Sequence, residues 1–129
     1  MAFKNRIVTV KKLPRELNVA QSRVFLRELE TLIHADRPCL VLDCSSVGQM
    51  SKAGMCLLLT CLEEAMKRNG DVRLAGLTPE SKVTMIASGV SHLFRMFDSN
   101  NEAVESFYPR PFSLALPEKL QDAAASVAA

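Results

Sequence analysis

The sequence lacks the features that mark several large classes of protein. Its longest apolar run is far shorter than the roughly 20 residues that a membrane-spanning helix needs. Lys4 and Arg6 interrupt the N-terminal stretch, where a secretory signal would carry its apolar segment. The net charge is only +2 and the basic residues are scattered, so there is no footprint for nucleic acid. These absences predict a cytoplasmic protein with no membrane span and no nucleic-acid partner.

Metal-binding and catalytic motifs are also missing. The cysteines form no Cys-x-x-Cys pair and have no His at zinc spacing; they are Cys39, Cys44, Cys56 and Cys61. We therefore expect reduced thiols buried in the core, and no metal. There is no Gly-rich phosphate loop and no catalytic triad, and Asp43, His34 and His92 each lack a partner at a useful spacing. We expect no enzyme activity and no cofactor.

The 129 residues are enough for one domain with its own core, and 48% hydrophobic with 23% charged residues is typical of a globular protein. The β-branched, alternating residues 6–10 predict a strand. The continuous apolar run 39–43 predicts a strand covered on both faces, and residues 71–76 predict a third. A short apolar segment at 92–97 is a further strand candidate.

Four helices are predicted between and after these strands. The first opens with a capping box at Asn18 and Gln21 and runs to about His34. The others cover 53–68, 78–89 and 99–107, with Thr78 capping the third and Ser99 or Asn100 capping the last. Asn69 and Gly70 both tolerate the left-handed conformation that ends a helix. Apolar side chains are predicted on the inner faces: Val24, Phe25, Leu29, Leu32 and Ile33; Met55, Leu58, Leu59, Leu62, Ala65 and Met66; and Ala103, Val104 and Phe107.

Strands that alternate with helices predict parallel pairs joined by right-handed crossovers. We therefore expect an α/β fold: one domain with a small, mixed or mostly parallel sheet of four to five strands, packed with about four helices. The domain is predicted over residues 1–107, followed by a Pro- and then Ala-rich tail at 108–129. Three alternatives remain open for the tail. Phe112, Leu114 and Leu116 pack back on the domain, pair with a second subunit in a homo-oligomer, or belong to a disordered end.

The loop after Asp43 follows the carboxyl end of a strand, where α/β proteins usually place function. It leads to the start of the second helix, at Ser51 and Lys52. Lysine is unusual there, because a helix N-terminus carries partial positive charge. Ser51 is fully explained as the N-cap, and phosphorylation of Ser51 is the alternative. Asp43 is expected to accept backbone hydrogen bonds within the loop.

This region carries a resemblance to a known family, the STAS domain shared by bacterial anti-sigma-factor antagonists and sulfate transporters. The stretch "VLDCSSV" is similar to the family's strand ending in Asp and to its loop. The stretch "QMSKAGMC" lies over the family's phosphorylation motif, Asp-Ser-Ser-Gly-Leu-Gly, which opens a helix. The similarity spans about residues 6–107, and its second half, "LEEAMKRNGDVRLAGLTPESKVTMIASGVSHLFRMFDSNNEAV", is the most specific part.

The resemblance implies a function and a departure from it. In family members that act as partner switches, a serine-kinase anti-sigma factor phosphorylates the Ser after the motif's Asp, and the unphosphorylated form binds that kinase. Here Ser51 stands at the Asp position, Lys52 at the phosphoacceptor position and Ala53 at the second Ser, while Gly54 is kept. Because lysine has no hydroxyl, the family's switch cannot operate at Lys52, and Ser51 is the possible substitute.

The implied function is that of an anti-sigma-factor-antagonist-like, protein-binding module of a bacterial partner-switching system that regulates transcription. The partner would be an anti-sigma factor or a serine-kinase-like regulator. The alternative is a small-ligand protein that binds nucleotide or lipid phosphate through Lys52, or a transporter-associated STAS subunit. The implied partner-binding residues, with burial in the core as the alternative for both methionines, are Gln49, Met50, Ser51, Lys52, Gly54 and Met55.

Overall fold

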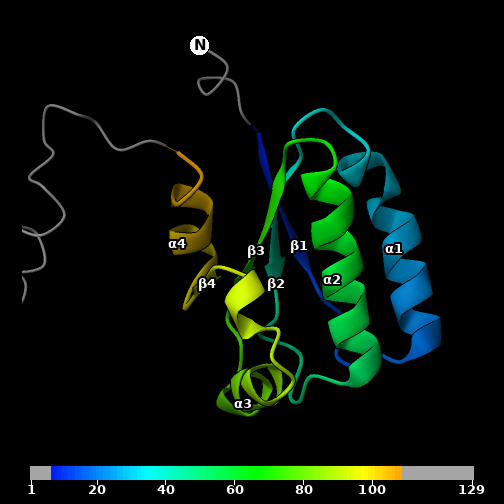
Figure 1. Ribbon diagram of the computed structural model, residues 1–129, viewed down its shortest axis with the longest axis vertical. Coiled ribbons are helices and arrows are strands. Elements are labelled where there is room, and N and C mark those ends of the chain that lie inside the picture. Colours follow the sequence, from blue (N-terminus) through cyan, green and yellow to red (C-terminus); the bar gives the residue numbers. More distant parts are fainter. Residues whose placement is uncertain (1–6, 109–129) are drawn as a thin grey trace, which may run out of the picture.

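The computed structural model describes residues 7–108, which form one four-stranded parallel sheet and its helices (Figure 1). The strands lie side by side in the order β1-β2-β3-β4, which confirms the expected α/β fold. The elements in chain order are β1 (Val8–Lys12), α1 (Val19–Ile33), β2 (Cys39–Asp43), α2 (Lys52–Met66), β3 (Asp71–Ala75), α3 (Pro79–Ala87), the short 3-10 helix η2 (Ser91–Leu93), β4 (Met96–Phe97) and α4 (Asn100–Glu105).

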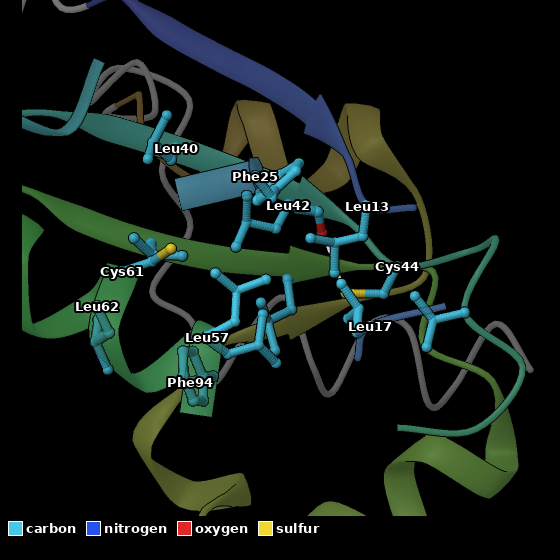
Figure 2. Packing of buried hydrophobic residues seen from close by; sticks show 14 of the residues in the cluster. Leu13, Leu17, Phe25, Leu40, Leu42, Cys44, Leu57, Cys61, Leu62 and Phe94 are labelled. Carbon is cyan, nitrogen blue, oxygen red and sulfur yellow. Dashed lines mark hydrogen bonds between the residues drawn. The ribbon is translucent and has the colours of Figure 1, made fainter. Parts of the chain in front are cut away.

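The helices cover both faces of the sheet. Helices α1 and α2 lie together on one face, and α4 lies on the other (Figure 1). Strand β2 is buried on both sides, as its continuous apolar run predicts. Leu40 and Leu42 point into the larger core beneath α1 and α2 (Figure 2), whereas Cys39 and Val41 belong to a smaller cluster beneath α4. Because successive side chains of β2 point to opposite faces of the sheet, this one strand contributes to both apolar clusters.

Side-chain caps begin every α-helix, as the sequence predicts. The side-chain oxygens of Asn18, Ser51, Thr78 and Ser99 each accept a hydrogen bond from the backbone N–H three residues later. Ser99, and not Asn100, is the cap of α4. Each cap satisfies a backbone donor that the first turn leaves unpaired.

Strand β1 and helix α2 differ from their predicted bounds. Helix α2 spans Lys52–Met66, where residues 53–68 are predicted. The strand covers Val8–Lys12, two residues later than predicted, because this span pairs along the whole of β2, from Cys39 to Asp43. Asn69 and Gly70 are both candidates for the left-handed conformation after α2. Of these two, Asn69 has a positive φ, of 61°, and Gly70 does not. Gly70 serves another purpose, because a Cβ there would overlap the carbonyl oxygen of Pro38.

Several predicted inner faces are rotated from those observed. Val24 and Met66 are exposed, and so is Cys56, contrary to the prediction for all three. Leu32, Met55 and Leu59 are only partly buried. On α2 the buried stripe is instead Gly54, Leu57, Leu58, Cys61, Leu62 and Ala65. This stripe follows the helical period from Gly54, which places Met66 beyond its edge.

Candidate functional site

The loops that follow β2, β3 and β4 meet at the carboxyl end of the sheet. Asp43, the last residue of β2, accepts a hydrogen bond from the Ser45 N–H at 2.9 Å and another from Asn100 Nδ2 at 3.1 Å. The first contact confirms the expected loop role of Asp43. The second comes from 57 residues away, and no local signal in the sequence points to it.

These contacts set the charge state of Asp43. Burial by itself would raise the pKa of the carboxyl, but the hydrogen bonds from Ser45 and Asn100, together with the positive charge of Lys12, outweigh it. The pKa of Asp43 is therefore below its usual value. An ionised Asp43 connects the β2 loop to the start of α4.

The loop between Asp43 and α2 is anchored along its length. The Cys44 N–H donates to the Ala75 carbonyl at 2.8 Å, and Thr78 Oγ1 donates to the Gly48 carbonyl at 2.7 Å. Gly76 has a φ of +70°, and a Cβ there would lie 3.2 Å from Ser45 Cβ, so glycine suits this close approach. The loop that carries Gln49 is thus held in place by the loop after β3.

Two of the predicted partner-binding residues are buried. Met50 is 2% exposed and lies in the larger core, so the alternative left open for it, burial in the core, is the one observed. Its thioether fills the space beside Gly54, where a Cβ would lie 2.7 Å from Met50 Sδ and 3.0 Å from Leu17 Cδ1. Apolar burial and the missing side chain of Gly54 let the start of α2 pack closely on the chain before α1.

Ser51 is the N-cap of α2, as predicted. Its hydroxyl oxygen accepts the Gly54 N–H at 3.0 Å, and its O–H donates to the Leu17 carbonyl at 2.7 Å. The second bond joins residues 34 apart in sequence, and it fixes α2 to the segment that precedes α1. Both the donor and one acceptor site of this hydroxyl are therefore in use.

Lys52 is the first residue of α2, and its side chain is exposed. Within residues 7–108 no carboxylate forms an ion pair with it. Gln49 is also exposed, and Met55 is half-buried. The accessible part of the predicted patch is thus Gln49, Ser51, Lys52 and Met55, which we call the α2 entry patch.

The buried thiols are poor candidates for chemistry. Burial raises the pKa of Cys61 to about 12, and burial together with the negative charge of Asp43 raises that of Cys44 to about 12.

In the described part of the chain, no group of three or more His, Cys, Asp or Glu is placed to hold a metal ion. No helix there is long and apolar enough to cross a membrane.

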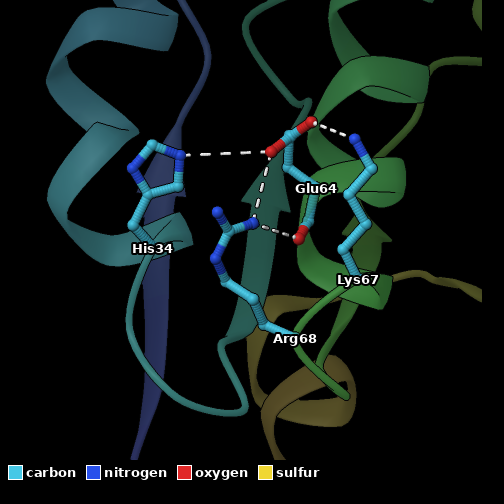
Figure 3. A network of polar contacts seen from close by, with 4 residues as sticks. All are labelled: His34, Glu64, Lys67 and Arg68. Atoms are coloured by element: carbon cyan, nitrogen blue, oxygen red, sulfur yellow. Dashed lines mark hydrogen bonds and ion pairs between the residues drawn. The ribbon is translucent and has the colours of Figure 1, made fainter.

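A polar network lies at the other end of α2, away from the entry patch (Figure 3). Glu64 accepts hydrogen bonds from Lys67 Nζ at 3.1 Å and Arg68 Nη1 at 3.2 Å, and these hydrogen bonds lower the pKa of its carboxyl. His34 Nε2, at the end of α1, lies 4.0 Å from Glu64 Oε1. The tertiary structure thus gives His34 a partner that its sequence neighbours do not, and the contact joins the ends of two helices.

The comparison with known families decides the classification. The sequence model of the STAS domain matches residues 2–103 of this chain. The chain belongs to the STAS domain family. No curated protein matches its sequence closely enough to add to that assignment.

Solved structures share the STAS fold at low sequence identity. A candidate anti-sigma factor antagonist from Thermotoga maritima has a TM-score of 0.68 at 16% identity, over 76% of this chain and 86% of that one. An anti-sigma-factor antagonist (STAS) domain protein from Planctomyces limnophilus also has a TM-score of 0.68, at 13% identity, over 76% and 88%. The STAS domain of a SulP transporter from Vibrio cholerae has 0.62 at 17% identity, over 77% and 79%. At these identities the likeness is one of fold.

Proposed function

We propose that this STAS protein is an anti-sigma-factor-antagonist-like module of a partner-switching system, and that it binds its protein partner through the α2 entry patch. One observation carries the proposal. Lys52, at the position where the family's partner switches have their phosphoacceptor, is exposed and has no ion-pair partner among the described residues. The similarity to antagonist structures supports the same class of function.

The surroundings of Lys52 and Ser51 indicate how binding would be regulated. Lys52 has no hydroxyl, and its ammonium group suits an acidic surface on the partner. The Ser51 hydroxyl caps α2 and donates to the Leu17 carbonyl, so phosphorylation would remove that O–H donor and place negative charge beside the carbonyl oxygen. Binding is therefore proposed to be independent of phosphorylation at this motif.

The test is affinity capture from an extract of the source cells, followed by mass spectrometry with phosphosite mapping. The baits are the wild type, Lys52→Glu, and Arg27→Glu as a matched charge reversal on an exposed part of α1. An anti-sigma factor or kinase-like regulator captured by the wild type and by Arg27→Glu, but lost with Lys52→Glu, supports the proposal. Equal capture of the partner by all three baits contradicts binding at the α2 entry patch. A phosphate on Ser51 contradicts the loss of the switch.

A second candidate function has support from two similar structures, the STAS domain of a SulP transporter from Vibrio cholerae and a sulfate transporter family protein from Wolinella succinogenes. In that case Lys52 and the start of α2 bind the phosphate of a nucleotide or lipid. Unfolding temperatures with nucleotides and with anionic vesicles test this function, since a ligand that binds only the folded state raises the temperature. A rise that disappears in Lys52→Glu supports it, and no rise with either class contradicts it.

A further inference from the structure

Strand β1 has one side open to a further strand. Residues Val8–Lys12 pair with β2 on one side, and within residues 7–108 no strand pairs with the other. An edge strand of this kind presents backbone N–H and C=O groups that a further strand can use.

Apolar surface lies beside this edge on the α1 side of the sheet. Val24 of α1 is 51% exposed. It lines a hollow of about 490 Å³ between β1 and α1; the other lining residues are Val10, Lys11, Lys12, Pro14, Gln21, Phe25 and Glu28. Val24 has the helical spacing of an inward residue, but nothing in the described part of the chain covers it. A further strand at this edge would cover the Val24 side chain.

The course of α4 leads the chain toward β1. As the chain passes from β1 to β4, α1 and α2 lie on one face of the sheet. Helix α4 lies on the opposite face and contacts all four strands (Figure 1). A chain that returns in the opposite direction over the opposite face makes a right-handed crossover again, as parallel strands require. The next position that such a crossover reaches is the open side of β1.

The end of α4 lies within reach of this position. Phe107 packs in the same apolar cluster as Val8 of β1, and the described chain ends one residue later, at Tyr108. The four steps from Tyr108 to Phe112 span up to roughly 14 Å. Neighbouring strands are only about 4.8 Å apart. Four extended steps can therefore span about three strand positions.

The sequence beyond Tyr108 contains one segment with the pattern of a strand. Residues 112–116 read Phe-Ser-Leu-Ala-Leu, with large apolar side chains at every second position. Pro111 and Pro117 bracket the segment, and proline, which has no N–H, suits the ends of a strand. Its five residues equal the length of β1.

We propose that residues 112–116 bind in cis along the open side of β1 as a fifth parallel strand. Phe112, Leu114 and Leu116 face α1, cover Val24 and fill the hollow. The smaller side chains of Ser113 and Ala115 face the α4 side. The proposal is independent of the partner-binding function.

Amide hydrogen exchange and methyl NOEs on the full-length protein test the proposal. In the wild type we expect slow exchange at the β1 amides that point away from β2, and NOEs between the Val24 and Leu114 methyl groups. Leu114→Asp should speed exchange at those amides by about tenfold or more and leave the β2 amides unchanged. Leu120→Asp, the same substitution outside the segment, should have no effect.

Rapid exchange of the outward-facing β1 amides in the wild type would overturn the proposal, and so would equal protection in Leu114→Asp. Sedimentation over a range of concentrations distinguishes two sources of the strand that pairs with β1, the same chain or a second copy of the protein. Protection that persists in the monomer supports binding in cis. Protection that disappears together with a dimer on dilution assigns the edge to a second copy and overturns binding in cis.

Discussion

Three consecutive residues at the start of α2 have different surroundings. Met50 is enclosed by the core, Ser51 makes two hydrogen bonds, and Lys52 projects from the surface. A substitution at each therefore tests a different property. Met50 and Ser51 determine how α2 is seated, and Lys52 is the residue free to contact another molecule.

Ser51→Ala should lower the free energy of unfolding by about 1–2 kcal/mol, because it removes the cap of α2 and the bond to Leu17. Lys52→Ala should change it by less than about 0.5 kcal/mol, since the side chain is exposed. Urea unfolding of the two variants measures the difference. Equal, small effects would show that the cap contributes little.

Cys56 should be the thiol that reacts first in the native protein. It is exposed on α2, whereas Cys39, Cys44 and Cys61 are buried. Brief alkylation with iodoacetamide at pH 8, read by mass spectrometry, is expected to modify Cys56 alone, and Cys56→Ser should abolish native labelling. Fast labelling of Cys44 or Cys61 would contradict the packing described above.

At the scale of elements, one arginine of β3 joins the sheet to the end of α4. The Arg73 side chain is 12% exposed, and its Nε donates to Asp71 Oδ2 at 3.0 Å. Its Nη1 donates to Ser106 Oγ at 2.7 Å, and its guanidinium lies 3.9 Å from the centre of the Phe107 ring. These contacts connect β3 to the end of α4.

Arg73→Ala should therefore destabilise the protein by about 2 kcal/mol, through lost hydrogen bonds and a lost cation–π contact. We also expect faster amide exchange in α4 than in α1 or α2. Arg95→Ala is the matched control, because Arg95 is exposed and lies 5.5 Å from the Phe97 ring. Uniform acceleration in all helices would show that Arg73 does not act locally.

At the scale of the whole molecule, the carboxyl end of the sheet is held by bonds between distant loops. Asp43 is bonded to Asn100, Gly48 to Thr78, and Cys44 to Ala75. These contacts bring together the segments that follow β2, β3 and β4. This arrangement holds the loop before α2 in place from several elements at once.

The lowered pKa of Asp43 predicts part of the acid sensitivity of the fold. A carboxyl whose pKa is lower in the folded state stabilises that state above its unfolded pKa of about 4, and the contribution is lost as the pH falls through the folded value. Asp43→Asn should therefore lose less stability than the wild type between about pH 5 and pH 2. Urea unfolding across this range measures it.

Asp98→Asn controls for the loss of one negative charge, because the side chain of Asp98 is largely exposed. If Asp43→Asn and the wild type lose stability in parallel as the pH falls, the hydrogen bonds to Asp43 do not favour its ionised form.

The sequence by itself determined the features that depend on short-range chemistry. A cap hydrogen bond spans three residues, so Asn18, Ser51, Thr78 and Ser99 could be identified as caps or cap candidates before the fold was known. The apolar run of β2 and the alternation of strands and helices indicated the parallel sheet, because both patterns can be read along the chain without knowing the fold. The similarity of residues 6–107 to the STAS pattern indicated the family.

The tertiary structure decided which apolar side chains are covered. Met50 and Met66 are equally hydrophobic, yet one is 2% exposed and the other 60%, because burial depends on which elements lie opposite. The bond between Asp43 and Asn100 and the contact between His34 and Glu64 join residues that are adjacent only after the strands pair. No local pattern encodes such contacts, since they depend on the positions of several elements at once.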